Sequence, residues 1–315
     1  MGQGVAHATP ERSAGPRRGY LARLSATDLA IVLLSALLHA VWSVSIKQSG
    51  DPLCFNVLQT WSGSLLLAVA APWIPWHAIP APVWGFVLLT GPTHALYLYW
   101  MSRAYEHGDL SLVYPIARST PAFLPPFAML LFGEELHPLG ALGIAVVVGG
   151  MWLVHLQPGV HRAHAETATR FAVLTLLATV AYSLIDKSAM TRLAASEWPG
   201  SVPRAIAYSL LLQVAHALAF APLFFRARSA AELRAAARTQ LATASAAALI
   251  SFAGYALILR AFETSLASYV VAVRQSSVLF AVALGALWLR ERPGRPRVLG
   301  AVATVVGVAL IAAFG

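Results

Sequence analysis

Two arginines, Arg118 and Arg274, lie inside long runs of apolar residues. An arginine at the centre of a membrane helix costs about 2.5 to 3.5 kcal/mol on insertion scales, so its charge needs a partner. The nearest acids along the chain flank these runs, about 18 Å or more away at the helical rise, and we expect no mid-depth acid on any other helix. Because a guanidinium binds carboxylate, phosphate or phosphonate through paired hydrogen bonds, the pattern favours an anionic substrate.

A second interpretation of the arginines stays open: both could bind backbone carbonyl groups that broken helices leave free. Each proline in a helix removes one N–H donor and releases one carbonyl. Four prolines surround Arg118, namely Pro115, Pro121, Pro125 and Pro126. No proline occurs between residues 266 and 289, so this interpretation explains Arg274 less well.

The only two lysines, Lys47 and Lys187, each lie five residues after an aromatic side chain, Trp42 and Tyr182 respectively. Lysines at the ends of membrane helices commonly extend their ammonium groups to the interface. Their matched placement instead predicts that they bind substrate at opposite entrances of a cavity. We expect Trp42 and Tyr182 to line that cavity, although packing between helices would also explain them.

Several titratable side chains within or at the ends of apolar runs are candidates for proton coupling. A histidine can change its charge near physiological pH, although an intramembrane histidine often only joins two helices by a hydrogen bond. The candidates are His39, His94, His216, Glu106 and Glu263. The sequence has no Walker loop, nucleophile elbow or His-Glu-x-x-His motif, so we expect no enzyme, cofactor or metal site.

The composition indicates the membrane as the environment of these residues. The 315 residues are 58% hydrophobic and 11% charged, with a mean hydropathy of +0.68, whereas soluble domains carry about a quarter charged residues. The net charge of +9 does not indicate a nucleic-acid partner, because the arginines cluster between apolar runs, where they meet lipid headgroups. We therefore expect an integral, multi-pass protein of the cell (inner or plasma) membrane.

Apolar runs of about 20 residues, the length that spans a bilayer, predict ten transmembrane helices. They cover about 28–47, two spans within 51–103, and 110–132, 138–155, 170–187, 205–225, 240–260, 266–289 and 297–314. We expect a disordered polar tail over residues 1–27, a first five-helix unit over 28–156, a connecting loop over 157–169 and a second unit over 170–315. The distribution of lysine and arginine leaves the orientation open.

The two units repeat the same short motifs. Trp42–Lys47 matches Tyr182–Lys187, and Arg103-Ala-Tyr-Glu106 matches Arg260-Ala-Phe-Glu263 at a spacing of 157 residues. The same spacing joins Gly133-Glu134 to Arg290-Glu291. Because each unit has an odd number of helices, the second must enter the membrane from the opposite side. The sequence thus predicts an all-α membrane protein with two inverted five-helix repeats, an architecture typical of secondary transporters.

These duplicated motifs resemble the EamA-type transporters of the drug/metabolite transporter superfamily over about residues 29 to 314. Glu135 departs from the common pattern, which has arginine after the glutamate. The resemblance implies transport of a small metabolite without ATP, through a cavity lined by the first, third, fourth, sixth, eighth and ninth helices.

The combined interpretation is a secondary transporter, acting by alternating access, for a small anionic or zwitterionic metabolite: an amino acid, organic acid, phosphonate or phosphorylated compound. Its expected partners are this solute, the lipid bilayer and a coupling proton or counter-substrate, and it would act as a monomer or homodimer. An exporter of hydrophobic or cationic drugs is an alternative, disfavoured by the expected lack of a mid-membrane acid. An intramembrane lipid-modifying enzyme is an alternative of another class.

Overall fold

The computed structural model describes residues 24–108, 110–155, 165–287 and 294–315, and all regular secondary structure within these ranges is helical. Nearly all of the expected tail, most of the connecting loop and the Arg290-Glu291 motif lie outside the described residues. The first repeat contains α1 (Ala26–Lys47), α2 (Pro52–Ala70), α3 (Ala81–His107), α4 (Leu110–Ala117), α5 (Thr120–Phe132) and α6 (Pro138–His155). The second contains α7 (Ala165–Ala194), α8 (Arg204–Ala227), α9 (Ala230–Thr264), α10 (Ala267–Arg274), α11 (Ser277–Leu287) and α12 (Arg295–Phe314).

Helix boundaries follow local capping chemistry. The Asp51 carboxylate accepts hydrogen bonds from the first backbone N–H groups of α2, and Pro52 occupies the first helical position. Ser229 and Glu232 form a capping box at the start of α9. The helix α5 ends at Gly133, whose φ of 65° lies in the left-handed region that glycine adopts without strain.

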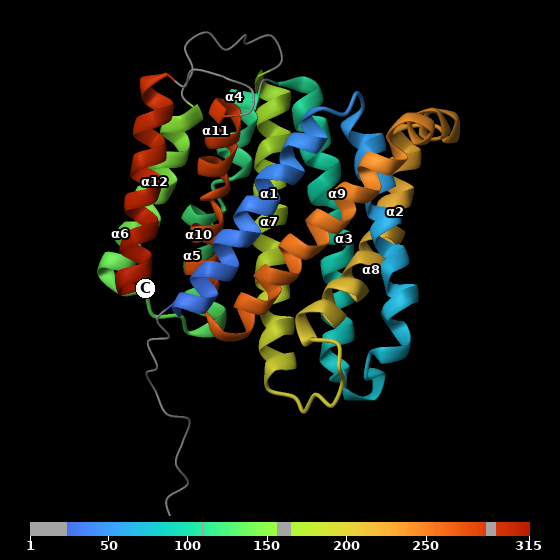
Figure 1. The fold of residues 1–315 in the computed structure, drawn as a ribbon, viewed down its shortest axis with the longest axis horizontal. Helices are drawn as coiled ribbons and strands as arrows, with labels where there is room; N and C mark the ends of the chain where they lie inside the picture. The colour runs from blue at the N-terminus through green and yellow to red at the C-terminus, as the bar shows by residue number, and fades with distance from the viewer. Residues whose placement is uncertain (1–23, 109, 156–164, 288–293) are drawn as a thin grey trace, which may run out of the picture.

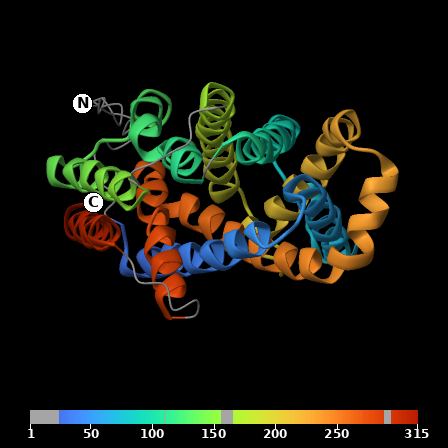
Figure 2. The same ribbon diagram turned by 90° about the horizontal axis from the view of Figure 1, so that it is seen from above.

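The helices of the two repeats pack against each other rather than forming separate halves. In Figure 1, α6 and α12 lie side by side at one end of the molecule, and α2, α8 and α9 lie at the other. Helix α1 packs on α9, and α3 packs on α7 and α8, so every major contact joins one repeat to the other. Seen from above, α1 and α9 run along one side, opposite α3 and α7 (Figure 2). The interior is therefore shared by both repeats.

Glycines allow the closest of these contacts, between α6 and α12. A Cβ atom on Gly150 would lie 2.7 Å from the Gly300 carbonyl oxygen, and one on Gly143 would lie 2.8 Å from the Gly307 carbonyl oxygen. Side chains at these positions would push the helices apart. Small residues are the usual means by which membrane helices approach closely.

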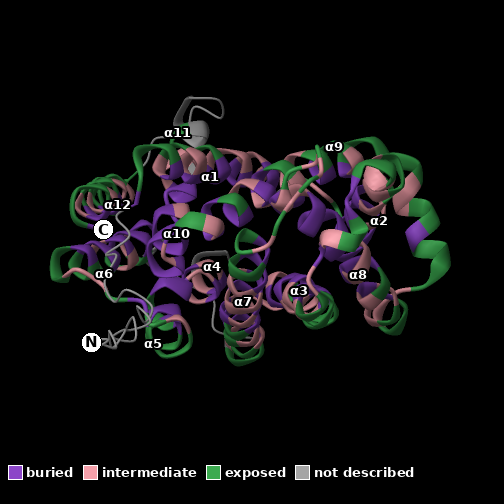
Figure 3. Ribbon diagram, turned by 90° about the horizontal axis from the view of Figure 1, so that it is seen from below, coloured by how far each residue is buried: buried purple, intermediate pink, exposed green. Residues whose placement is uncertain are grey.

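The outer surface is apolar where it faces away from this interior. Leu130 on α5 and Leu88 on α3 are 81% and 72% exposed, and exposed residues lie mainly on the outward faces of the helices in Figure 3. Among the described residues, six helical segments are long and apolar enough to cross a membrane: Ala26–Ile46, Pro52–Trp73, Glu166–Ala194, Arg204–Ala227, Ala230–Thr264 and Arg295–Phe314. Such a surface is suited to lipid rather than to water.

Two of the expected helices are broken in the middle. The helix α4 ends just before Arg118 and α5 begins at Thr120, whereas α10 ends at Arg274 and α11 begins at Ser277. The Ser119 and Ser276 hydroxyls, which lie 157 residues apart in the sequence, donate to the carbonyls of Pro115 at 2.6 Å and Val273 at 2.7 Å. The second break was not expected from the sequence, because residues 266–289 contain no proline; serine and tight turns are present at both breaks.

Candidate functional site

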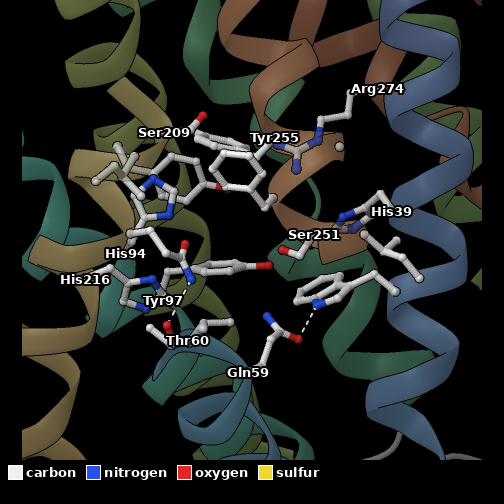
Figure 4. Close-up of a pocket in the computed structure, with 18 residues that line it drawn as sticks. His39, Gln59, Thr60, His94, Tyr97, Ser209, His216, Ser251, Tyr255 and Arg274 are labelled. Carbon is white, nitrogen blue, oxygen red and sulfur yellow. Dashed lines mark hydrogen bonds between the residues drawn. The ribbon is translucent and has the colours of Figure 1, made fainter. Parts of the chain in front are cut away.

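The helices enclose a cavity of about 70 Å³, here called the main cavity, between the two repeats (Figure 4). That volume holds several water molecules or a small polar group. Its walls come from α1, α2 and α3 of the first repeat and from α7, α8, α9 and α10 of the second. The contributions of α2, through Gln59 and Thr60, and of α8, through Ser209 and His216, were not expected from the sequence.

A second, smaller cavity of about 20 Å³ brings the two intramembrane arginines to one place. Arg118 and Arg274 both line this small cavity, and Arg274 also lines the main cavity. The breaks in the two helices explain the position, because each arginine lies at the end of a short helix that stops inside the molecule.

The two arginines have different partners. The guanidinium of Arg118 contacts Nε2 of His39 and lies 5.2 Å from the centre of the Tyr114 ring. The guanidinium of Arg274 lies 5.4 Å from the centre of the Tyr255 ring, and its buried Nε has no hydrogen-bond partner among the described residues. Binding to a free carbonyl, the alternative interpretation, therefore does not account for the Nε of Arg274.

A buried acid lies behind the wall of the main cavity. The side chain of Asp186 is fully buried and lies 3.1 Å from Nε2 of His94. Its carboxylate also accepts hydrogen bonds from Thr90 Oγ1 at 2.6 Å, Tyr208 OH at 2.8 Å and Tyr255 OH. The sequence predicts Asp186 at the end of a span, whereas the structure places it inside α7, buried against α3, α8 and α9.

The sequence does not indicate Asp186 as a buried acid, because it predicts the end of this helix too early. The sequence places the end of the sixth span at residue 187, whereas α7 continues to Ala194, about two turns further. Only fifteen uncharged residues separate Arg170 from Asp186, which is short for a membrane span. That shortage was the available signal that the helix continues past the acid.

The predicted aromatic residues line the main cavity. Trp42 donates from Nε1 to Gln59 Oε1 at 2.6 Å, and Tyr182 stacks on the ring of His94 with 3.9 Å between ring centres. His39, His94 and His216 lie on the same walls, and Nε2 of His216 is buried without a partner among the described residues. The cavity thus combines aromatic faces with several polar groups.

The predicted lysines and glutamates do not line either cavity with described side chains. Lys187 donates from Nζ to the carbonyls of Phe262 at 2.7 Å and Ser265 at 2.8 Å, so it caps the end of α9. The side chain of Lys47 lies outside the described part of the structure. Of the two glutamates, Glu106 pairs with Arg103 and Arg228, and Glu263 lies 3.6 Å from Arg260. These placements give Lys187, Glu106 and Glu263 structural contacts away from the cavities.

Some residues that line the cavities carry buried polar atoms without a hydrogen-bond partner. Buried polar groups in folded proteins are nearly always hydrogen-bonded, so these exceptions mark groups whose hydrogen bonds are not satisfied by the protein. Four such atoms belong to cavity-lining residues: Ser209 Oγ, His216 Nε2, Arg274 Nε and Gln275 Oε1. Within the described residues, no group of three or more His, Cys, Asp or Glu side chains is placed to hold a metal ion.

Comparisons with known proteins identify the family to which this chain belongs. A solved structure titled only "Crystal structure of protein" aligns with a TM-score of 0.64 at 16% identity, covering 90% of this chain and 95% of that one, and shares the fold. No curated protein matches the chain. The family model described as "EamA-like transporter family" matches residues 27–156 and again residues 170–313. With two copies that cover most of its length, this multi-pass membrane protein belongs to the EamA-like transporter family of the drug/metabolite transporter superfamily.

Proposed function

We propose that this transporter moves a small anionic or zwitterionic metabolite across the cell membrane by alternating access. The substrate class is an amino acid, organic acid, phosphonate or phosphorylated compound. Counting α4 with α5 and α10 with α11 as one helix each gives ten helices, five in each repeat, which supports ten spans in two inverted repeats. Rocking of one repeat against the other would then open the shared cavity to either side.

The observation that carries this proposal is the unpartnered guanidinium nitrogen of Arg274. A buried donor that lacks an acceptor costs about 1 to 3 kcal/mol, and a charged one costs more. Arg274 Nε is buried on the wall that the two cavities share, and Arg118 lines the same small cavity. A carboxylate, phosphate or phosphonate there would receive charge-assisted hydrogen bonds in a site with little water.

A cationic or hydrophobic substrate is the second candidate, and the buried Asp186 is the observation in its favour. Its carboxylate nevertheless has no exposed surface, and three hydroxyl groups together with His94 already surround it. A cation in the main cavity would therefore meet His94 and Arg274 rather than a free acid. An anionic substrate, in contrast, would meet a favourable positive charge, that of Arg274, at the cavity wall.

The test is thermal stabilisation of the detergent-purified protein by a panel of amino acids, organic acids, phosphonates, sugar phosphates and cationic drugs. A ligand at 100 times its Kd stabilises a folded protein by about 2.7 kcal/mol. We expect one anionic class to raise the melting temperature of the wild type but not of Arg274→Gln. Arg260→Gln is the matched control, because Arg260 lies on α9 with its side chain 45% exposed and lines neither cavity. Stabilisation by cations alone would contradict the proposal.

A further inference from the structure

Asp186 fixes the orientation of one histidine of the main cavity. The carboxylate takes hydrogen bonds from three neutral hydroxyls, on Thr90, Tyr208 and Tyr255, and these replace the water that an exposed carboxylate would have. Its Oδ2 atom lies 3.1 Å from Nε2 of His94. Beside an ionised carboxylate, which only accepts hydrogen bonds, the ring carries its proton on Nε2. Asp186 thereby sets the tautomer of His94.

The other ring nitrogen of His94 is then a free proton acceptor. With the proton on Nε2, the Nδ1 atom carries a lone pair, and no described side chain forms a hydrogen bond with it. His94 lines the main cavity and stacks on Tyr182, which holds the ring in place. The pair therefore presents one free ring nitrogen to the cavity while the other is held by the acid.

The charged and titratable groups around His94 come from four helices. From α7 it meets Asp186 and Tyr182, from α9 it meets Tyr255 at 5.2 Å between ring centres, and Arg274 of α10 lines the same cavity. From α8 it meets His216 at 5.9 Å between ring centres, and Tyr208 binds the same carboxylate. Among them Arg274 carries the positive charge that opposes protonation of His94, and Asp186 carries the negative charge that favours it.

Tyr255 connects the acid to the arginine. Its hydroxyl donates to Asp186, and the guanidinium of Arg274 lies over its ring. An anion bound at Arg274 cancels the charge that repels a proton from His94, and a proton on His94 strengthens the attraction for the anion. Binding of each then favours the other by the same factor.

We propose that His94, held by Asp186, is the proton-binding site of this transporter and that one proton binds there together with the anionic substrate. The proton enters from water onto Nδ1, the imidazolium keeps its Nε2–H bond to Asp186, and the proton leaves from Nδ1 when the anion leaves. This inference rests on the proposed function for the identity of the co-bound anion. The proton site itself is testable without any solute.

The experiment is an NMR titration of the imidazole nitrogens of ¹⁵N-histidine-labelled protein in detergent, between about pH 5 and pH 8.5, the range in which histidine commonly titrates. The signals of His94 are those lost in His94→Gln. We expect the Nε2–H tautomer at high pH and a second proton on Nδ1 at low pH. In Asp186→Asn the tautomer preference and the uptake of the second proton are weakened. An Nδ1–H tautomer, or a ring that stays neutral throughout, would overturn the proposal.

A second variant tests the coupling and keeps the test decisive if Asp186→Asn does not fold. Arg274→Gln removes the opposing charge and so mimics the anion-bound state, and we expect His94 to become protonated at a higher pH than in the wild type. Arg260→Gln serves as the control for loss of an arginine elsewhere. An unchanged titration of His94 in Arg274→Gln would disprove the coupling.

The two proposals can fail separately. If the ligand panel finds no stabilising anion while His94 titrates as expected, the proposed substrate class is wrong and the proton site stands. If an anion stabilises the protein through Arg274 while His94 stays neutral, the substrate class stands and the proton site is wrong.

Discussion

The first and second repeats break the same helix by different means. At the first break Pro121 occupies the start of α5, where it cannot extend α4. At the second break no proline is present, and Gln275 and Ser276 close tight turns onto Ala272 and Val273. The serine that bonds back to a carbonyl is common to both, at Ser119 and Ser276. The break therefore belongs to this position in the repeat, and proline is only one way to make it.

Unlike the two serines, the arginines at the two breaks do not occupy equivalent positions in their repeats. A spacing of 157 residues aligns Arg118 with Gln275, so Arg274 lies one position earlier in its repeat. Arg118 contacts His39, whereas Arg274 faces both cavities with an unpartnered Nε. The small shift thus separates an arginine held by the protein from one available to a ligand.

Replacing the two arginines in turn tests this difference with the largest expected effect. We expect Arg274→Gln to reduce transport of the stabilising solute by about thirtyfold to a few thousandfold. Loss of one partner of a buried, hydrogen-bonded charge pair costs about 2 to 5 kcal/mol, and 1.4 kcal/mol corresponds to a factor of ten. For Arg118→Gln we expect a loss of about tenfold, because it acts through His39. Initial uptake rates in proteoliposomes measure both, and equal losses would contradict the division of roles.

A second comparison concerns the matched motifs Trp42–Lys47 and Tyr182–Lys187, in which Asp186 occupies the place of Ile46. We expect Asp186→Ile, which makes the two motifs alike, to lower the free energy of unfolding by about 3 kcal/mol. The hydroxyls of Thr90 and Tyr208 would lose their acceptor while staying buried, at about 1 to 3 kcal/mol for each unpaired group.

Denaturation of the detergent-purified protein measures this change. The control is Glu263→Gln, which removes a carboxylate whose ion-pair partner, Arg260, is 3.6 Å away and 45% exposed. Because the Arg260 side chain is 45% exposed and the Glu263 side chain 12% exposed, water screens one side of this pair, and we expect its loss to cost about 1 kcal/mol. A stability equal to that of the control would show that the Asp186 network is not structural.

The contrast between Arg118 and Asp186 explains what the sequence could predict. A charge inside an apolar run is visible in the sequence, so the position of Arg118 and Arg274 inside the helix bundle was predictable. Asp186 lies close to a charged residue, Lys187, and was placed at a helix end, because only the packing of α7 on its neighbours decides where that helix ends. The duplicated motifs likewise predicted the repeat architecture. The contribution of α8 to the cavity wall could not be predicted, because it depends on how the helices pack together.

The proline of the first break can be transferred to the second, where a small effect is expected. Position 278 lies 157 residues after Pro121, and Val278 occupies the second position of α11. Proline is tolerated in the first turn of a helix, but Val278→Pro removes the 3.0 Å hydrogen bond from the Val278 N–H to the Gln275 carbonyl, so we expect it to lower the free energy of unfolding by about 1 to 2 kcal/mol. Ala256→Pro, in the continuous helix α9, should cost about 3 kcal/mol or more. Similar losses in both variants would show that the second break needs the N–H of Val278.

The ends of the repeats differ as well, and this difference predicts a small dependence on pH. At the corner formed by α3, α8 and α9, Arg228 binds Asp51 at 2.9 Å and Glu106 at 2.9 Å, joining the two repeats by ion pairs. At the corner after α9, Lys187 binds backbone carbonyls instead. Partial burial alone would raise the pKa of Asp51, but hydrogen bonds from the Cys54 N–H and from Arg228 lower that pKa below its ordinary value.

A lowered pKa means that Asp51 contributes stability above the ordinary pKa of an aspartate, and that this contribution is lost as the pH falls through the lower, folded-state value. We expect the wild type to melt at a higher temperature than Asp51→Asn at neutral pH and the difference to shrink below about pH 4, the ordinary range of aspartate. Because these side chains are partly exposed, the difference at neutral pH should be about 1 kcal/mol or less. Melting temperatures of both proteins across this pH range, with Arg228→Gln for comparison, measure the effect. A difference that grows as the pH falls would mean that the corner is not held by the Asp51 carboxylate, and the contrast with the Lys187 corner would then disappear.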